Sequence, residues 1–174
     1  MQNKKYLREK IILISKEMVS SGMNQSTSGN ISVRSNSGML ITPSSVPCKS
    51  MVPNDLLEID FEGNSIESSI HKKSLRPSSE WKLHADIYRH RKGINSIIHC
   101  HSIHATALAC HDRSIPSFHY MIAVAGGENI RCAPYATFGS ADLSRNALLA
   151  LEDRFACLLA QHGQVAIAEN LEKA

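Results

Sequence analysis

Apolar positions at the start of the chain recur with the period of an α-helix. Between residues 4 and 20 they fall on one helical face, formed by Leu7, Ile11, Ile14 and Met18. A glycine at position 22 marks a natural helix end. The pattern therefore predicts an amphipathic first helix with one buried face.

The next stretches have the alternation and the turn residues of strands. Residues 30–43, NISVRSNSGMLITP, predict two short strands around a turn at 35–38. Residues 56–66, LLEIDFEGNSI, predict a strand that runs into a turn at 62–64. The N-terminal half thus combines one helix with at least three strands.

The remaining sequence alternates between helical and extended patterns. Residues 76–91, RPSSEWKLHADIYRHR, predict a helix with Ser78 or Ser79 as its N-cap and Glu80 in its first turn. The later elements are a strand at 94–102, a helix-prone segment at 105–110, a strand and turn at 130–139, a helix at 140–153 capped by Ser140, and two buried strands within 155–169. This interleaving favours a layered α/β sandwich that forms a single domain over residues 1–174.

Composition narrows the class of partner and the compartment. The net charge is only +3 and the basic residues are scattered, so nucleic acid is a poor partner, although a small anionic ligand fits. The apolar run at 11–14 is too short for a secretory signal or a membrane span. Five cysteines without CxxC spacing favour reduced thiols, and we therefore expect a cytoplasmic protein.

The segment SIIHCHSIHATALAC at 96–110 places two histidines one residue apart within an apolar run. In a strand, His99 and His101 would point to the same face with Cα atoms about 6.5–7 Å apart, so both imidazoles can reach one metal ion. Packed or surface histidines are the alternative. A third ligand is needed, and His162 is the best candidate because Gly163 lets the chain turn beside it.

The other histidines are weaker candidates for the third ligand; they are His84, His90, His104, His111 and His119. Glu80 either complements the dipole of its helix or, if it faces the metal, serves as a ligand or a general base. Ser78 and Ser79 beside it form a natural phosphate cradle at a helix start. The loop TSGN at 27–30 offers further small donors or is an ordinary turn.

Seven motifs, in order along nearly the whole chain, resemble the class II aldolase/adducin family, and most closely its L-fuculose-phosphate aldolase branch. They are STSGNISVR, MLITPSS, RPSSEW, IIHCHSIHATALA, HYMIAVAGG, CAPYATFGS and QHGQVAIAENLEKA. The resemblance implies a three-layer sandwich with a central, mostly antiparallel sheet flanked by helices. It also implies a homotetramer with active sites at subunit interfaces.

The resemblance further implies the residues of a zinc-dependent lyase site. His99, His101 and His162 match the ligands of one Zn²⁺ per subunit, and Glu80 matches the catalytic acid/base that in some states touches the metal. Tyr120 matches a tyrosine near the reacting aldehyde. The residues that match the phosphate pocket are Thr27, Gly29, Asn30, Ser44, Ser45, Ser78 and Ser79. The implied reaction is reversible cleavage of L-fuculose 1-phosphate, or a similar ketose 1-phosphate, to dihydroxyacetone phosphate and a short aldehyde such as L-lactaldehyde.

Three departures from the family pattern qualify these expectations. Ser44-Ser45 replaces the usual Thr-Gly, and Gln164 replaces a residue that is more often hydrophobic. The sequence ends at Ala174, without the C-terminal helix and tail that the family implies. The alternatives are another phosphosugar lyase, epimerase, dehydratase or decarboxylase on the same scaffold, or a truncated, non-catalytic adducin-like module. Glu80 favours an aldolase, because the epimerases tend to carry aspartate there.

Overall fold

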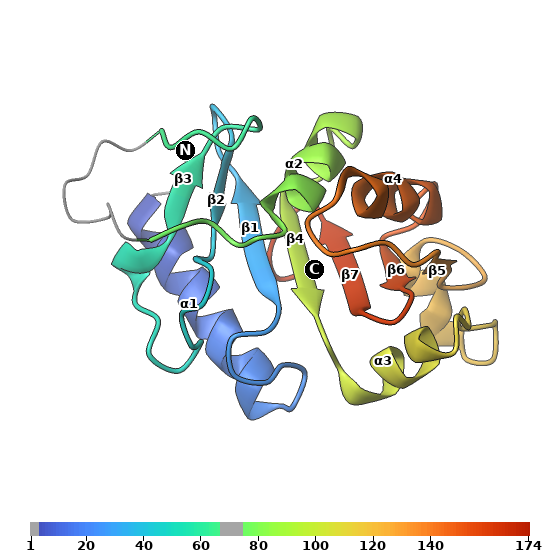
Figure 1. The fold of residues 1–174 in the computed structure, drawn as a ribbon. Helices are drawn as coiled ribbons and strands as arrows, with labels where there is room; N and C mark the ends of the chain where they lie inside the picture. The colour runs from blue at the N-terminus through green and yellow to red at the C-terminus, as the bar shows by residue number, and fades with distance from the viewer. Residues whose placement is uncertain (1–3, 67–74) are drawn as a thin grey trace.

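The computed structural model describes residues 4–66 and 75–174, which form a seven-stranded sheet in the order β3-β2-β1-β4-β7-β6-β5 (Figure 1). Neighbouring strands are antiparallel, except for the parallel pair β5 and β6. The strands are β1 (Asn30–Arg34), β2 (Met39–Ile41), β3 (Leu57–Ile59), β4 (Ser96–Cys100), β5 (Cys132–Ala133), β6 (Ala156–Leu159) and β7 (Gly163–Ala168). The expected central, mostly antiparallel sheet is thus confirmed.

The same described residues form four α-helices and two short 3₁₀ helices around the sheet. They are α1 (Lys4–Ser20), α2 (Trp81–His90), α3 (Ile103–Cys110), α4 (Ala141–Ala150), η1 (Pro53–Asp55) and η3 (Tyr120–Ala125). Helices α2 and α4 lie side by side, whereas α1 lies beside β1 and the turn η1 (Figure 1). Over 4–66 and 75–174, no helix combines the length and the apolar character needed to cross a membrane.

Two hydrophobic cores fill the spaces on the two faces of the sheet. On β1, Ile31 and Val33 are buried in the core that α1 covers. On β4, Ile97 is buried in the other core, against α2 and α4, where its near-complete exclusion from water stabilises the fold by roughly 1.5–3 kcal/mol. This alternation of side chains between two covered faces produces the expected three layers.

Several local predictions are confirmed in detail. The backbone N–H of Ser35 donates to the oxygen of Gly38 at 2.9 Å, which closes the β1–β2 turn. Ser140 caps α4, since its Oγ accepts from the N–H of Leu143 at 3.1 Å. The strand expected within 130–139 is shorter than predicted, because β5 ends where Pro134 removes a backbone donor.

The start of α2 differs from the prediction. Neither Ser78 nor Ser79 is the N-cap; Glu80 holds that position, and its side chain makes no capping hydrogen bond. The cause is a tight turn in which the N–H of Trp81 donates to the oxygen of Ser78 at 3.0 Å, so that regular helix begins only at Trp81. As a result the Glu80 carboxylate is free to point away from its own helix and toward the sheet.

Candidate functional site

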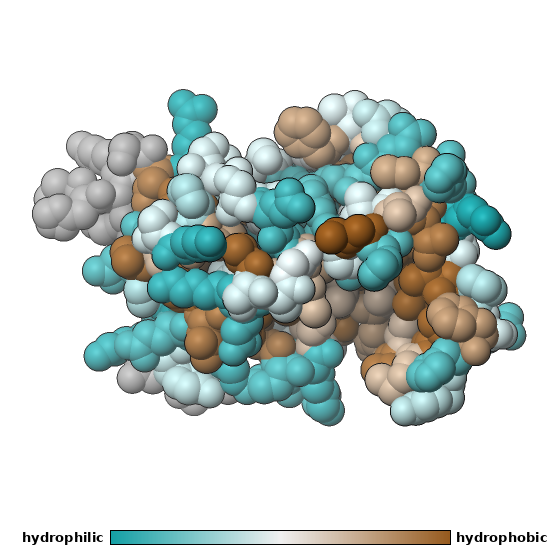
Figure 2. All heavy atoms as spheres, turned by 90° about the horizontal axis from the view of Figure 1, so that it is seen from below, coloured by the Kyte–Doolittle hydropathy of each residue, from teal (hydrophilic) through white to brown (hydrophobic). Residues whose placement is uncertain are grey.

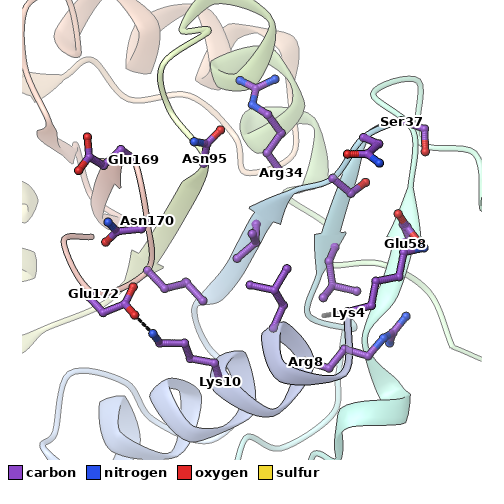
Figure 3. Close-up of a pocket in the computed structure, with 16 residues that line it drawn as sticks. Lys4, Arg8, Lys10, Arg34, Ser37, Glu58, Asn95, Glu169, Asn170 and Glu172 are labelled. Carbon is purple, nitrogen blue, oxygen red and sulfur yellow. Dashed lines mark hydrogen bonds and ion pairs between the residues drawn. The ribbon is translucent and has the colours of Figure 1, made fainter. Parts of the chain in front are cut away.

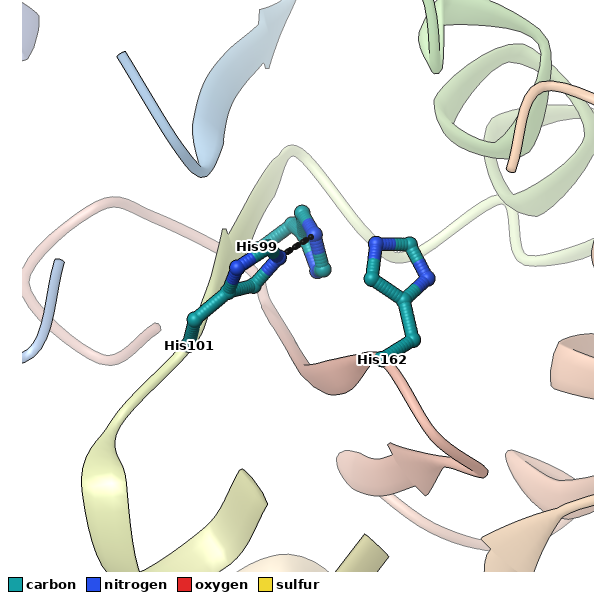
Figure 4. Close-up of side chains that lie close together, drawn as sticks. All are labelled: His99, His101 and His162. Carbon is teal, nitrogen blue, oxygen red and sulfur yellow. Dashed lines mark hydrogen bonds between the residues drawn. The ribbon is translucent and has the colours of Figure 1, made fainter. Parts of the chain in front are cut away.

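Three histidines from two neighbouring parts of the sheet converge on one point (Figure 4). His99 lies on β4, His101 follows it, and His162 lies in the turn between β6 and β7. The register that pairs His99 with Val165 brings this turn alongside the end of β4. One nitrogen from each ring lies within 4.8 Å of the other two. The separation of two residues therefore does place His99 and His101 together, and the sheet supplies the third ring.

The ring of His99 is fixed by a hydrogen bond to the backbone. Its Nδ1–H donates to the main-chain oxygen of Gln164 at 2.9 Å, and this directs Nε2 into the cluster. The Nε2 atoms of His99 and His101 are 2.9 Å apart. Two such atoms bound to one tetrahedral zinc ion would be about 3.3 Å apart, so the observed spacing needs little adjustment.

Partial burial favours the neutral form of the imidazole rings of His101 and His162. It lowers the pKa of His101 to about 4, with the charges of His99 and His162 acting in the same direction. Burial also lowers the pKa of His162, as does the charge of His99. Neutral imidazole is the form that binds metal ions, so both rings are available as ligands at neutral pH.

Glu80 closes the remaining side of the cluster. Its Oε2 lies 3.2 Å from Nε2 of His99, and its Oε1 lies 3.4 Å from Nε2 of His162. Burial alone raises the pKa of the carboxyl, but the charge and hydrogen bond of His99, together with His162 and Asn30, lower it to about 2. Its contacts with His99, His162 and Asn30 therefore keep Glu80 ionised.

The donor set fits a divalent cation. Glu80 Oε1 is a buried oxygen without a hydrogen-bond partner among the described residues, and it faces the cluster. Three imidazole nitrogens and a carboxylate are typical ligands of zinc-class ions, and three protein ligands leave a position open for substrate. A cation bound by His99, His101 and His162 would also satisfy the orphaned oxygen of Glu80.

A line of buried polar side chains runs from Glu80 into the core. Asn30 Nδ2 donates to Glu80 Oε2 at 3.0 Å, and His84 Nε2 lies 2.6 Å from Asn30 Oδ1. Beyond His84, Ser32 Oγ lies 2.7 Å from Nδ1 of His84 and 2.9 Å from the hydroxyl of Tyr88. In the sequence, His84 is only a weak candidate for a metal ligand. Its position four residues after Glu80 is the one sequence feature that indicates a link between the two side chains.

The segments expected to bind phosphate lie together at one end of β1, β2 and α2. The N–H of Ser78 donates to the oxygen of Thr42 at 3.0 Å, and the N–H of Ser44 donates to the oxygen of Arg76 at 2.8 Å. These bonds align residues 42–45 with 76–79. The side chain of Asn30 is already engaged with Glu80 and His84, and only one of its donor hydrogens remains.

The loop before β1 is tied to the histidine cluster through Asn24. Gly29 has φ of 74°, and a Cβ there would lie 2.2 Å from Asn24 Nδ2. The buried Asn24 in turn accepts the backbone N–H of His101 through Oδ1 at 3.0 Å. Thr27, in the same loop, is exposed. Only glycine allows this close approach, so Asn24 contacts both the loop, at Gly29, and the backbone of His101.

Tyr120 is placed differently from the other expected site residues. It begins η3, is 79% exposed, and stacks on His119 with ring centroids 4.6 Å apart. Exposed apolar side chains surround it in sequence: Phe118, Met121 and Val124. Apolar surface is visible on the half of the molecule that holds α3 and β5 (Figure 2). Among the described residues of one chain, Tyr120 makes no ring contact or hydrogen bond with the three histidines or Glu80.

The two substituted positions have clear local roles. Ser45 has φ of 63°, a left-handed conformation that glycine adopts without strain, and its Oγ lies 3.3 Å from that of Ser44. Gln164 Oε1 accepts from Ser102 Oγ at 2.7 Å. This bond links β7 to the residue directly after His101, so Gln164 supports the cluster through both its backbone and its side chain.

A pocket of about 540 Å³ lies apart from the histidines, between α1, the β1–β2 turn and residues 169–172 (Figure 3). Its charged groups are largely paired: Lys10 contacts Glu172, and Lys4 lies 2.6 Å from Glu58. None of the expected site residues lines it. This pocket is therefore separate from the histidine cluster.

Comparisons with known proteins identify the family of the chain. The family model for the class II aldolase and adducin N-terminal domain matches residues 9–174. An L-fuculose phosphate aldolase of Escherichia coli K12 is 46% identical over 168 residues, which are 97% of this chain and 75% of that protein. A 5-methylthioribulose-1-phosphate/5-deoxyribulose-1-phosphate aldolase of Rhodospirillum rubrum is 45% identical over 168 residues, covering 97% of this chain and 73% of the relative.

Solved structures give the same result. An L-fuculose 1-phosphate aldolase superposes with a TM-score of 0.89 at 40% identity, over 96% of this chain and 77% of that one. The L-fuculose-1-phosphate aldolase of Thermus thermophilus superposes with a TM-score of 0.79 at 27% identity, over 96% and 80% of the two chains. The chain therefore belongs to the class II aldolase and adducin family, and it is a metal-dependent aldolase, a carbon–carbon lyase.

Proposed function

We propose that the protein catalyses the zinc-dependent, reversible aldol cleavage of L-fuculose 1-phosphate to dihydroxyacetone phosphate and L-lactaldehyde. The observation that carries this proposal is the convergence of three imidazoles within 4.8 Å beside the ionised Glu80. His99, His101 and His162 hold the cation. When bound, zinc supplies the Lewis acid that stabilises negative charge on the ketone oxygen of the substrate.

The side chains of the site move the two protons of the reaction. Cleavage removes the proton of the C4 hydroxyl, breaks the C3–C4 bond, and leaves the electron pair on C3 and the adjoining carbonyl. Glu80, ionised in the resting site, takes up one proton from water and delivers it to C3 through Oε1, the oxygen without a hydrogen-bond partner among the described residues. Tyr120 relays the proton of the C4 hydroxyl to water in cleavage, accepting it on its oxygen as its own hydroxyl proton leaves, and the relay runs in reverse in synthesis.

The phosphate pocket fixes the substrate so that these groups meet the correct atoms. We assign phosphate binding to the aligned segments 42–45 and 76–79 with the loop at 27–30; the residues are Thr27, Gly29, Asn30, Ser44, Ser45, Ser78 and Ser79. Hydroxyl groups and backbone N–H groups at the start of α2 suit a dianion there. Holding the phosphate at a fixed distance from the cluster converts binding energy into orientation.

An assembly of several copies accounts for the position of Tyr120. Its ring is 79% exposed within one chain, and its exposed apolar neighbours suit a protein–protein contact. We propose a homotetramer in which Tyr120 reaches the site of an adjoining copy. Five cysteines free of disulfides suit a reducing compartment, and the proposed location is the cytoplasm.

A second substrate class is favoured by the 45% identity to the Rhodospirillum rubrum relative. The 5-deoxy and 5-methylthio ketose 1-phosphates share the phosphate, ketone and C3–C4 bond of fuculose 1-phosphate, so the same groups can cleave them. They differ only in the aldehyde that leaves. The site residues described above bind the common half, and they leave the choice of aldehyde to the groups around Tyr120.

The decisive experiment measures aldehyde release by purified protein from a panel of L-fuculose 1-phosphate, 5-deoxyribulose 1-phosphate and 5-methylthioribulose 1-phosphate, together with its metal content. We expect about one zinc per chain and the highest kcat/KM with fuculose phosphate. Faster turnover of either ribulose derivative would transfer the assignment to that substrate. Epimerisation, dehydration or decarboxylation in place of cleavage would remove the aldolase assignment, and absence of both metal and turnover would favour an adducin-like module.

A further inference from the structure

We propose that His84 is a positioning residue for Glu80, acting through a one-way chain of hydrogen bonds that runs from Tyr88 through Ser32 and Asn30 to the carboxylate. This inference rests on the proposed function, because it concerns the group that we assign as acid/base. It adds to that function a residue that touches neither substrate nor metal.

The direction of the chain follows from the carboxylate at its end. Ionised Glu80 Oε2 can only accept, so the amide of Asn30 must turn its NH₂ group toward it at 3.0 Å. Asn30 Oδ1 then faces Nε2 of His84 at 2.6 Å and needs a proton from that nitrogen. The neutral ring consequently carries its proton on Nε2, and its Nδ1 accepts from the hydroxyl of Ser32 at 2.7 Å.

The far end of the chain is closed by Tyr88. Because the hydroxyl hydrogen of Ser32 is committed to His84, Ser32 Oγ is left to accept from the Tyr88 hydroxyl at 2.9 Å. His84 and Tyr88 are fully buried, and Ser32 is fully buried as well. Water therefore cannot replace a lost partner easily, and each member of the chain fixes the orientation of the next.

The consequence for Glu80 is that its two oxygens are unequal. Oε2 is held by Asn30, whereas Oε1 is left without a hydrogen-bond partner among the described residues and faces His162. If His84 no longer held Oδ1, the amide of Asn30 could rotate and turn its oxygen toward Oε2, which would repel the carboxylate. His84 thus determines which oxygen of Glu80 is available for proton transfer.

The test compares His84→Phe with Ile87→Val, a matched control that alters another fully buried residue of α2 outside the chain. We expect His84→Phe to keep its metal content and, within about twofold, its KM, whereas kcat falls about 10–100-fold. Ile87→Val should keep kcat even where its melting temperature falls. Tyr88→Phe and Ser32→Ala should lower kcat by less, with Ser32→Ala the more severe of the two. A folded His84→Phe protein with unchanged kcat would overturn the proposal.

A spectroscopic measurement keeps the proposal testable if His84→Phe does not fold. The imidazole ¹⁵N resonances of His84 in the metal-loaded wild-type protein should show a protonated Nε2 and an unprotonated Nδ1, and the Asn30 NH₂ resonances should shift in Ser32→Ala. The opposite tautomer would overturn the proposal whatever the activity. Wild-type protein that cleaves none of the ketose phosphates would refute the proposed function alone, because the tautomer and the amide shift do not depend on turnover.

Discussion

Gly163 lies directly against the ring of His101: a Cβ at Gly163 would be 2.6 Å from Cδ2 of that imidazole and 2.6 Å from the backbone oxygen of Cys100. The absence of a side chain at this position is what allows the β6–β7 turn to approach the end of β4. His101 and His162 can therefore meet only because the residue after His162 is glycine.

Gly163→Ala should consequently disturb the metal cluster while the rest of the sheet forms. The added methyl group must displace the ring of His101 or the backbone of Cys100, and we expect zinc to bind about 10–100-fold more weakly. Competition with a chelator measures this change. Gly93→Ala is the matched control, because a Cβ there has no neighbour within 4 Å, and equal affinity in the two variants would contradict the close contact.

Loss of a ligand should abolish metal binding without a comparable loss of the fold. His162→Gln removes one of the three converging nitrogens, so we expect less than about a tenth of the wild-type zinc content and no measurable cleavage. His111→Gln, in an exposed turn, should retain both. Elemental analysis measures the zinc content of both variants, and the cleavage assay measures their activity. Full zinc occupancy in His162→Gln would show that the third ligand lies elsewhere.

Glu80→Gln should separate metal binding from catalysis. The variant keeps the three histidines and nearly the same volume, but its amide cannot exchange a proton with C3 of the substrate. We expect retained zinc and a kcat reduced by about 10²–10⁴-fold. Steady-state kinetics and metal analysis on the same preparation test this expectation, and unchanged turnover would exclude Glu80 from the proton-transfer step.

Ser45→Gly should stabilise the protein. Ser45 adopts φ of 63°, which costs roughly 1 kcal/mol for a residue with a side chain and much less for glycine. We expect the free energy of unfolding in urea to rise by up to about 1 kcal/mol. Ser44→Gly is the control: its φ is not positive, so glycine there should destabilise through greater freedom of the unfolded chain. A stability change of the same sign in both variants would contradict the strain.

The metal-free protein should lose stability as the pH falls below about 6.5. Burial, together with the charge of His99, lowers the pKa of His84 to about 3 in the fold. As the pH falls, His84 is therefore protonated in the unfolded chain before it is protonated in the fold. The contribution of the neutral His84 to the free energy of unfolding is lost progressively between about pH 6.5 and 3. At about pH 5 we expect a loss of about 2 kcal/mol from His84 alone. Urea unfolding near neutral pH and at the lower pH measures it, and a His84→Phe protein should lose less; an equal loss would assign the effect to other groups.

The sequence predicted the parts of the site that depend on local spacing. His99 and His101 share a strand face because side chains alternate, and the glycine after His162 indicated a turn that a ligand could occupy. The start of α2 was misjudged by one or two residues, because the turn that ends at Trp81 depends on the pairing of residues 76–79 with 42–44. Contacts of that kind are set by the sheet and cannot be read from one helix.

The chain of hydrogen bonds behind Glu80 could not be predicted from the sequence for the same reason. Asn30 and Ser32 alternate along β1 in the sequence, and this pattern alone does not show which covered face receives them. Only the placement of α2 against that face brings His84 between the two side chains. The position of Tyr120, outside its own cluster, likewise depends on the arrangement of loops rather than on periodicity.

The pairing of β4 with β7 makes correct sheet assembly a condition for holding the cation. A shift of one residue in that ladder would turn His99 to the opposite face and move the hairpin tip that carries His162 along the neighbouring strand. A chain with the shifted register would therefore not bind the cation. Binding of the cation would in turn stabilise the correctly aligned fold by mass action. Stoichiometric uptake of a zinc-class cation should thus report native strand alignment in variants that keep His99, His101 and His162.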